Sequence, residues 1–247
     1  MKKIILINPP QTYPIDLEGE YQSYVPMGIA CIGAVARDVG FETKIIDCLE
    51  DETVTYIGDK VVFGKSYDEI YEIIDQFQPS IIGISNSFTM FLDDANCLSN
   101  SLKKRYSDKL IFLGGVAPSL KETALKAFNE GSYDFMVKGE GEETVKDLLN
   151  NYNEYTNNID DIDSILGIYH VKNNELIENE NRPFICDLSK LPQPAFDLLN
   201  LKKILSNKFY SRWRNNPRNK LSIPVFTSRG CPYDCVFCSV HSQVGYT

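Results

Sequence analysis

Apolar and polar residues along the first 150 positions follow two alternating patterns. Short apolar runs rich in β-branched residues predict strands, and longer segments with apolar residues three or four positions apart predict helices. The predicted strands are Lys3–Asn8, Glu42–Asp47, Ser80–Ser85, Lys109–Leu113 and Phe135–Val137. The predicted helices are Pro26–Val39, Tyr67–Phe77, Asp93–Tyr106, Ser119–Asn129 and Gly141–Asn150. Strands that alternate with helices are typical of a parallel sheet covered on both faces.

The five predicted strands indicate an α/β fold with a five-stranded, doubly wound sheet. Right-handed crossovers leave few possible strand orders, and the flavodoxin-like order 2-1-3-4-5 is the common one at this size. Ligands of such sheets bind outside the carboxyl ends of the strands. A binding site is therefore expected in the loops that follow strands one, three, four and five.

Those four loops contain unusual residues. The first begins with Pro9, Pro10, Gln11 and Thr12 and runs for roughly eighteen residues, which is longer than a βα connection needs. The other three contain, in order, Ser85, Ser87 and Thr89, then Gly114, Gly115 and Val116, then Gly139, Glu140, Gly141 and Glu142. Glycines let a ligand approach the backbone closely, and hydroxyl groups can hydrogen-bond to it. The structural alternative is that the hydroxyl residues cap helices and that the last motif is a turn followed by a helix start.

The pattern changes after the fifth helix. Residues 150–163 are rich in Asn and Asp and predict a linker, and the segment from Ile165 through the Asn173-Asn174 pair predicts a hairpin. Leu191–Asp197 predicts an extended crossing segment, and Ile223–Ser228 predicts a strand that opens a second domain. The expected organisation is a domain over residues 1–150, a linker over 151–220 and the start of another domain over 221–247.

Composition narrows the function classes. The net charge of -9 argues against a nucleic-acid partner, although residues 201–220 contain seven lysines and arginines and no acidic residue. A solvated surface is the simpler interpretation of that segment. No window approaches the ~18 apolar residues of a membrane span, so we expect a cytoplasmic protein without a membrane partner. Four of the seven cysteines are scattered singly, at Cys31, Cys48, Cys97 and Cys186, which favours reduced thiols over disulfides.

The other three cysteines are Cys231, Cys235 and Cys238, spaced four and three residues apart. Three thiolates at this spacing can bind one side of a [4Fe-4S] cluster and leave the fourth iron open to another ligand. One alternative is a zinc site completed by His241, although structural zinc ligands usually come as two separated pairs. The other alternative is unliganded thiols in the protein core.

The segment Thr227–Ser239, which contains these cysteines and an aromatic residue before the last of them, resembles the cluster loop of the radical S-adenosylmethionine superfamily. Gly114-Gly115, the Ser85/Ser87 loop and Gly139 to Glu142 resemble the N-terminal domain of its cobalamin-binding branch. Pro192–Asp197 is similar to the connector between the two domains of that branch. The resemblance covers essentially the whole chain.

The resemblance implies that Cys231, Cys235 and Cys238 bind a [4Fe-4S] cluster whose open iron chelates S-adenosylmethionine, which one electron cleaves to a 5′-deoxyadenosyl radical. Phe237 would lie near the adenine, unless it is a buried aromatic of the barrel. An electron donor of the flavodoxin or ferredoxin type and a small-molecule substrate are the implied partners. The implied reaction is methyl transfer, or another radical reaction on an unactivated centre.

Cobalamin is the third implied cofactor. The residues expected to contact it come from the four loops described above: Pro10, Gln11, Thr12, Ser85, Ser87, Thr89, Gly114, Gly115, Val116, Gly139 and Glu140. The sequence departs from the Asp-x-His-x-x-Gly pattern of other cobalamin proteins, because the loop from Asn8 to Met27 contains no histidine. Any cobalamin would therefore be bound without a histidine ligand from this domain.

A second departure concerns the radical S-adenosylmethionine barrel, which needs on the order of 180 residues beyond the cysteine loop. Only nine residues follow Cys238, so we expect a truncated barrel in an N-terminal portion that is inactive alone. Two other functions stay open. One is a non-catalytic module that binds cobalamin or a nucleotide and has an inert or zinc-binding cysteine loop. The other is a radical enzyme that modifies tRNA.

Overall fold

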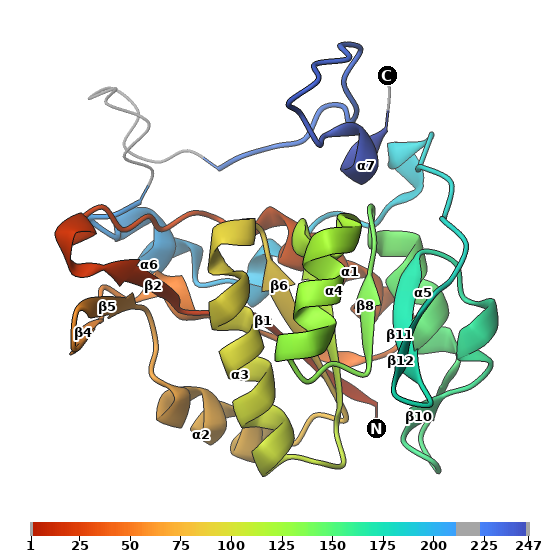
Figure 1. Ribbon diagram of the computed structural model, residues 1–247, viewed down its shortest axis with the longest axis horizontal. Helices are drawn as coiled ribbons and strands as arrows, with labels where there is room; N and C mark the ends of the chain where they lie inside the picture. The colour runs from red at the N-terminus through yellow and green to blue at the C-terminus, as the bar shows by residue number, and fades with distance from the viewer. Residues whose placement is uncertain (1, 211–222, 246–247) are drawn as a thin grey trace.

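The computed structural model describes residues 2–210 and 223–245. Its centre is a sheet with the strand order β12-β11-β8-β7-β6-β1-β3 (Figure 1). The parallel strands are β1 (Lys3–Asn8), β3 (Glu42–Asp47), β6 (Ile81–Asn86), β7 (Leu110–Gly115) and β8 (Phe135–Val137). They follow the predicted order 2-1-3-4-5, which is confirmed.

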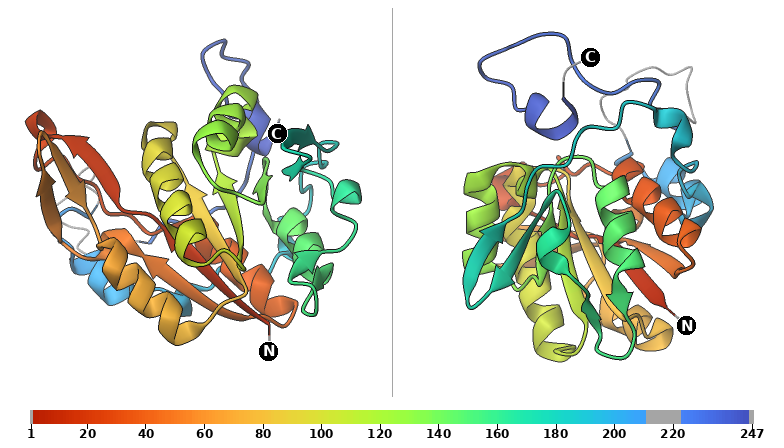
Figure 2. Two further views of the ribbon diagram at one scale, coloured as in Figure 1. Left: turned by 60° about the horizontal axis from the view of Figure 1, so that its bottom comes forward. Right: turned by 90° about the vertical axis from the view of Figure 1, so that its right-hand side faces the viewer.

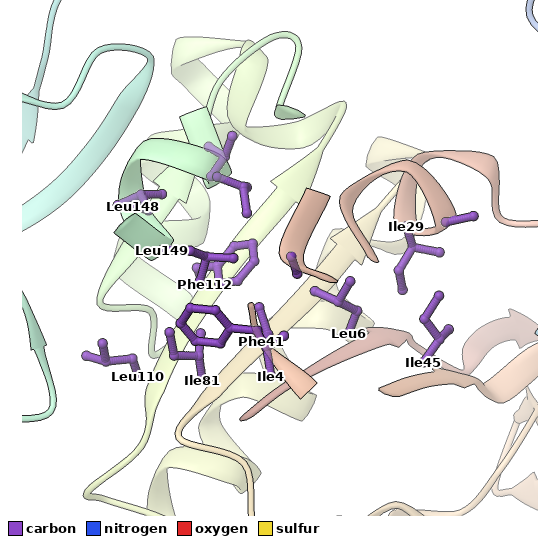
Figure 3. Packing of buried hydrophobic residues seen from close by; sticks show 14 of the residues in the cluster. Ile4, Leu6, Ile29, Phe41, Ile45, Ile81, Leu110, Phe112, Leu148 and Leu149 are labelled. Atoms are coloured by element: carbon purple, nitrogen blue, oxygen red, sulfur yellow. The ribbon is translucent and has the colours of Figure 1, made fainter. Parts of the chain in front are cut away.

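Both faces of the sheet are covered by helices, as predicted. The helices are α1 (Met27–Asp38), α2 (Tyr67–Phe77), α3 (Leu92–Arg105), α4 (Lys121–Glu130) and α5 (Glu142–Asn150). Successive side chains of a strand point to opposite faces, so β1 contributes to two cores. Ile4 and Leu6 pack with α1 and α5, and Figure 3 shows this core around Phe112. Ile5 and Ile7 pack with α2, α3 and α4.

The main sheet has seven strands rather than the expected five. The predicted hairpin forms as β11 (Ile168–Lys172) and β12 (Glu175–Glu178), and β11 pairs antiparallel with β8. Asn173 and Asn174 have φ values of 53° and 63°, as a two-residue hairpin turn requires. The hairpin therefore extends the sheet instead of standing apart in a linker, because β8 offers it a free edge.

A second, three-stranded antiparallel sheet was not predicted. It consists of β2 (Gln11–Pro14), β5 (Lys60–Phe63) and β4 (Val54–Ile57), in that order. The segment after β1, expected to be a loop, thus begins with a strand. The aromatic residues Tyr13, Tyr21, Phe63 and Phe209 pack beside this sheet in a third core.

The predicted strand Ile223–Ser228 does not form, because none of the described residues pairs with it as a strand. The connector crosses α1 as predicted: Ala195 N donates to Ala30 O at 3.0 Å, and Arg37 pairs with Asp197 at 2.6 Å. Within the described residues, no helix has the length and apolar content that a bilayer span requires. Residues 211–222, which include much of the basic segment, lie outside the described residues.

The remaining elements are short. They are β9 (Tyr152–Asn153), β10 (Asn158–Ile159), α6 (Leu201–Ser206), α7 (His241–Val244) and the 3-10 helices η1 (Ile15–Leu17), η2 (Cys48–Glu50), η3 (Thr89–Phe91), η4 (Ala117–Ser119), η5 (Ile162–Ser164), η6 (Leu188–Lys190) and η7 (Phe196–Leu198). Of these, α7 matters most for the site, because Figures 1 and 2 both show it above the carboxyl-end edge of the sheet.

A buried carboxyl group lies where β1 and β3 end. Asp47 is 3% exposed, and its Oδ1 accepts hydrogen bonds from Asn8 Nδ2 at 2.8 Å and from Leu49 N at 3.1 Å. Its other oxygen has no protein partner within the described residues. Burial raises the pKa of Asp47 from 3.8 to about 7, although the two hydrogen bonds act in the opposite direction. Asp47 therefore binds its proton more tightly in the folded chain than in the unfolded chain.

We expect the Asp47→Asn substitution to remove a pH dependence of stability. Because the pKa is raised on folding, the contribution of Asp47 to the free energy of unfolding falls as the pH rises from about 4 to about 7. Asparagine has the shape of the protonated acid and does not titrate. Urea unfolding should show that the free energy of unfolding of the variant, relative to that of the wild type, is about 3 kcal/mol higher at pH 8 than at pH 5. Equal stability differences at the two pH values would contradict this account of Asp47.

Candidate functional site

A cavity of about 320 Å³ lies at the carboxyl ends of the parallel strands, between the sheet and helices α1 and α5. Buried apolar side chains line much of it: Leu6, Ile29, Phe112, Val137 and Val145. Its polar lining comes from Ser85, Ser87, Ser119, Glu140, Glu142, Arg229 and Gln243. A largely apolar cavity with few polar groups is the usual form of a site for a small molecule or cofactor.

The two glycines that end β7 line this cavity for different reasons. A Cβ atom built on Gly114 would meet nothing within 4 Å, so the backbone of Gly114 borders open space. Gly115 has φ +103°, and a Cβ atom there would lie 2.4 Å from the carbonyl oxygen of Asn86 on the neighbouring β6. Gly114 therefore leaves room beside the cavity, whereas Gly115 is required by the backbone itself.

Seven of the eleven residues expected to contact cobalamin line the cavity. They are Ser85, Ser87, Gly114, Gly115, Val116, Gly139 and Glu140. The helix-capping alternative is not observed for the loop after β6, because the N-cap residue of α3 is Phe91 and no side chain caps this helix. The turn alternative for Gly139 does hold, since Gly139 has φ +62° and precedes α5. This motif thus forms a turn and borders the cavity as well.

The other four expected residues do not line the cavity. Gln11 and Thr12 lie in β2, where Gln11 Oε1 accepts a hydrogen bond from Tyr13 at 2.8 Å and the Thr12 amide donates to Asp94 at 3.0 Å. Pro10 packs against Gly64, and Thr89 begins η3. Of these residues, Thr12 links the small sheet to α3 through Asp94, and β2 turns the chain away from the main sheet.

Sequence reasoning missed the contributions of α1 and of the segment near the cysteines. Gly28, Cys31 and Ile32 of α1 line the cavity, together with Phe226 and Arg229. The signal in α1 that could have indicated this contribution is its row of small and apolar residues. No local pattern signals the contribution of Arg229, because its partners lie almost ninety residues earlier in the chain.

The cysteine loop projects away from the sheet (Figure 2). Cys235 and Cys238 are exposed and Cys231 is half-buried. Cys238 N donates to Cys235 O at 2.9 Å, and Cys231 N donates to Gly245 O at 3.3 Å, so a turn and helix α7 shape the loop. The donor set of three accessible thiols suits an iron–sulfur cluster.

The three thiols do not converge on one point. Within residues 2–210 and 223–245, no three His, Cys, Asp or Glu side chains gather closely enough to bind a metal ion. His241, the candidate fourth zinc ligand, places Nε2 3.1 Å from the carbonyl oxygen of Cys231. Phe237 is 90% exposed, so it is not a buried aromatic in the described part of the chain. Binding a cluster would draw the thiols together, as is common for sites that form with their metal.

A match to a known protein family identifies the kind of domain that contains this cavity. Residues 21–149 match the B12 binding domain, which is more than half of the 247-residue chain. This chain belongs to the B12-binding domain family. All seven expected cobalamin residues that line the cavity lie inside the matched range. This match confirms the part of the sequence resemblance that concerns the cobalamin-binding domain.

Curated relatives of this B12-binding protein include methyltransferases and a cyclase. An uncharacterised methyltransferase of Pyrococcus horikoshii is 28% identical over 224 residues, covering 89% of this chain and 41% of the relative. An anaerobic magnesium-protoporphyrin IX monomethyl ester cyclase of Synechocystis is 27% identical, covering 96% of this chain and 42% of the relative. The cytidylyl-2-hydroxyethylphosphonate methyltransferase of Streptomyces wedmorensis is 24% identical, with coverages of 96% and 48%. The chain thus spans less than half the length of these relatives.

A solved structure shares the fold of this B12-binding protein. It is the radical S-adenosylmethionine methyltransferase TsrM from Kitasatospora setae, with cobalamin and a [4Fe-4S] cluster bound. The TM-score is 0.51 at 15% identity, and the match covers 81% of this chain and 34% of TsrM. The cofactors expected from the sequence agree with the family and with the contents of that structure.

The cavity fits the nucleotide tail of cobalamin, which ends in a flat apolar base. The buried side chains of Leu6, Phe112 and Val145 provide apolar walls, and the open space beside Gly114 lets a ligand reach the backbone. Ser85 and Ser87 provide hydroxyl groups for its polar part. Neither His170 nor His241 lines the cavity.

Proposed function

We propose that this chain supplies the cobalamin-binding domain and the cluster ligands of a radical S-adenosylmethionine enzyme that acts on a small molecule. The cavity inside the B12-binding fold is the observation that carries the proposal, because its lining combines apolar walls, open glycine backbone and hydroxyl groups. Methyl transfer is the favoured reaction, since two of the three relatives described above are named as methyltransferases. The whole enzyme's substrate would be recognised by residues beyond those of this cavity.

The residues of the chain divide into two sets by task. Ser85, Ser87 and the backbone of Gly114, Gly115, Val116 and Gly139 would hold and orient cobalamin. Cys231, Cys235 and Cys238 would bind the [4Fe-4S] cluster, with Phe237 beside the adenine of S-adenosylmethionine. When bound, these cofactors supply the methyl-carrying cobalt and the radical, which are chemistries that no side chain of the protein provides. An electron donor of the flavodoxin or ferredoxin type would reduce the cluster.

Titrating the full chain with hydroxocobalamin tests the first part of this proposal. We expect a change in the visible spectrum of the corrin and retention of about one equivalent through a desalting column, because the cavity would surround the nucleotide tail. The readout is absorbance and does not depend on turnover. An unchanged spectrum together with complete loss of the cofactor on the column would overturn the cobalamin assignment.

A further inference from the structure

The cysteine loop and the B12-binding domain share the cofactor cavity. Phe226 and Arg229, just before the cysteines, line it together with Gln243 and Val244, just after them. The opposite lining comes from the carboxyl ends of β6, β7 and β8 and from α1 and α5. A ligand in this cavity would therefore contact both parts of the chain.

Arg229 makes the firmest contact between the two parts. Its Nη1 lies 2.8 Å from Glu140 Oε1, and its Nη2 lies 2.5 Å from Glu142 Oε1. The side chain of Arg229 is only 15% exposed, that of Glu140 5% and that of Glu142 7%. We call these three residues the Arg229 triad. Arg229 stands two positions before Cys231, so the triad fixes the start of the cysteine loop.

The triad is also connected beyond its own ion pairs. The second oxygen of Glu140 accepts a hydrogen bond from Ile185 N at 2.6 Å, and Glu142 opens α5. Arg229 is therefore the shared ion-pair partner of both carboxylates.

The chemistry of the triad is specific to arginine. A planar guanidinium can donate to two carboxylates at once in a fixed geometry, whereas the lysine ammonium is a single point charge. Removing one partner of a buried ion pair leaves an uncompensated charge, which is more costly than losing an exposed pair. Loss of Arg229 or of the two carboxylates would therefore release the loop from the cavity rather than weaken its attachment slightly.

We propose that the Arg229 triad docks the cysteine loop onto the cofactor cavity, so that filling the cavity and docking the loop stabilise each other. Arg229 is then a positioning residue that sets where the cluster lies relative to the cobalamin. This inference rests on the proposed function for the identity of the ligand, but the docking itself is a property of the chain alone. Coupling of this kind is reciprocal: a docked loop strengthens ligand binding as much as the ligand strengthens docking.

Hydrogen–deuterium exchange of the full chain without any cofactor tests the docking. We expect amide exchange in the segment 226–245 to be at least about tenfold faster in Glu140→Gln/Glu142→Gln and in Arg229→Lys than in the wild type. The strands of the main sheet should keep their protection, which shows that the variants fold. Glu143→Gln is the matched control, since Glu143 is adjacent in the first turn of α5 and forms no ion pair among the described residues. Unchanged exchange in the triad variants would overturn the docking.

The second measurement repeats the exchange with hydroxocobalamin and determines its affinity by absorbance. We expect cobalamin to slow exchange in 226–245 in the wild type, and the triad variants to bind it at least about tenfold more weakly than Glu143→Gln does. Binding with equal affinity in all variants and no protection of the loop would overturn the coupling while the proposed function stands. If cobalamin does not bind at all, the proposed function fails and the coupling with it, whereas the cofactor-free exchange still decides the docking.

Discussion

We expect the Cys235→Ala variant to lose the ability to hold a four-iron cluster. Three protein thiols leave one iron of such a cluster open, so removing one thiol leaves two ligands for four irons. Anaerobic reconstitution of the full chain with iron and sulfide should give the wild type about four irons and a broad visible absorbance. The variant should retain neither after desalting.

Two exposed cysteines provide matched controls for this experiment. Cys97 and Cys186 are exposed like Cys235 but lie far from it in sequence, in α3 and before η6. Cys97→Ala and Cys186→Ala should therefore bind iron and sulfide as the wild type does. A wild-type chain that takes up one equivalent of zinc and no sulfide would refute the cluster and support the zinc alternative with His241. Equal iron content in Cys235→Ala and the wild type would also refute it.

The second large effect concerns the neighbouring glycines at the end of β7. We expect Gly115→Ala to lower the free energy of unfolding by roughly 4–5 kcal/mol, because it adds a strained φ to a clash that no side chain can relieve. The methyl group would lie 2.4 Å from the Asn86 carbonyl oxygen, within a strand pair of the central sheet. Urea unfolding measures this loss directly. A Gly115→Ala variant as stable as the wild type would contradict the described approach of β7 to β6.

Gly114→Val should change stability little and weaken cobalamin binding. Its side chain enters open space beside the cavity, so we expect stability within about 1 kcal/mol of the wild type. Cobalamin should be bound at least about tenfold more weakly, since the valine occupies room that a ligand needs. Absorbance titration with hydroxocobalamin measures the affinities of Gly114→Val and of the wild type. If Gly114→Val binds cobalamin as tightly as the wild type, then Gly114 does not face the cofactor.

The sequence predicted the central strands well because each is a local pattern. β1, β3 and β8 are short strands whose bounds agree with the prediction. Right-handed crossovers then restricted the strand order. The small sheet was missed because its strands β4 and β5 are only four residues long and β4 is mostly exposed.

The site was predicted in part for a related reason. Loops at the carboxyl ends of parallel strands meet at one edge of the sheet, so Ser85, Gly114 and Gly139 came together as expected. Pro10 and Gln11 did not, because the pairing of β2 with β5 is a long-range contact that no local pattern records. The contact of Arg229 with Glu140 could not be predicted from the sequence for the same reason, because it is also long-range.

The hairpin of β11 and β12 has a practical consequence for dissecting this protein. β8 has only three residues, and the hairpin covers the edge that β7 does not. A shorter piece ending at Asn150 would expose that edge, which could then pair with another chain and aggregate. We therefore expect a well-behaved minimal B12-binding fragment to extend through Glu178. The loop that follows β8 contains Gly139 and Glu140, so the same hairpin stabilises one wall of the cofactor cavity.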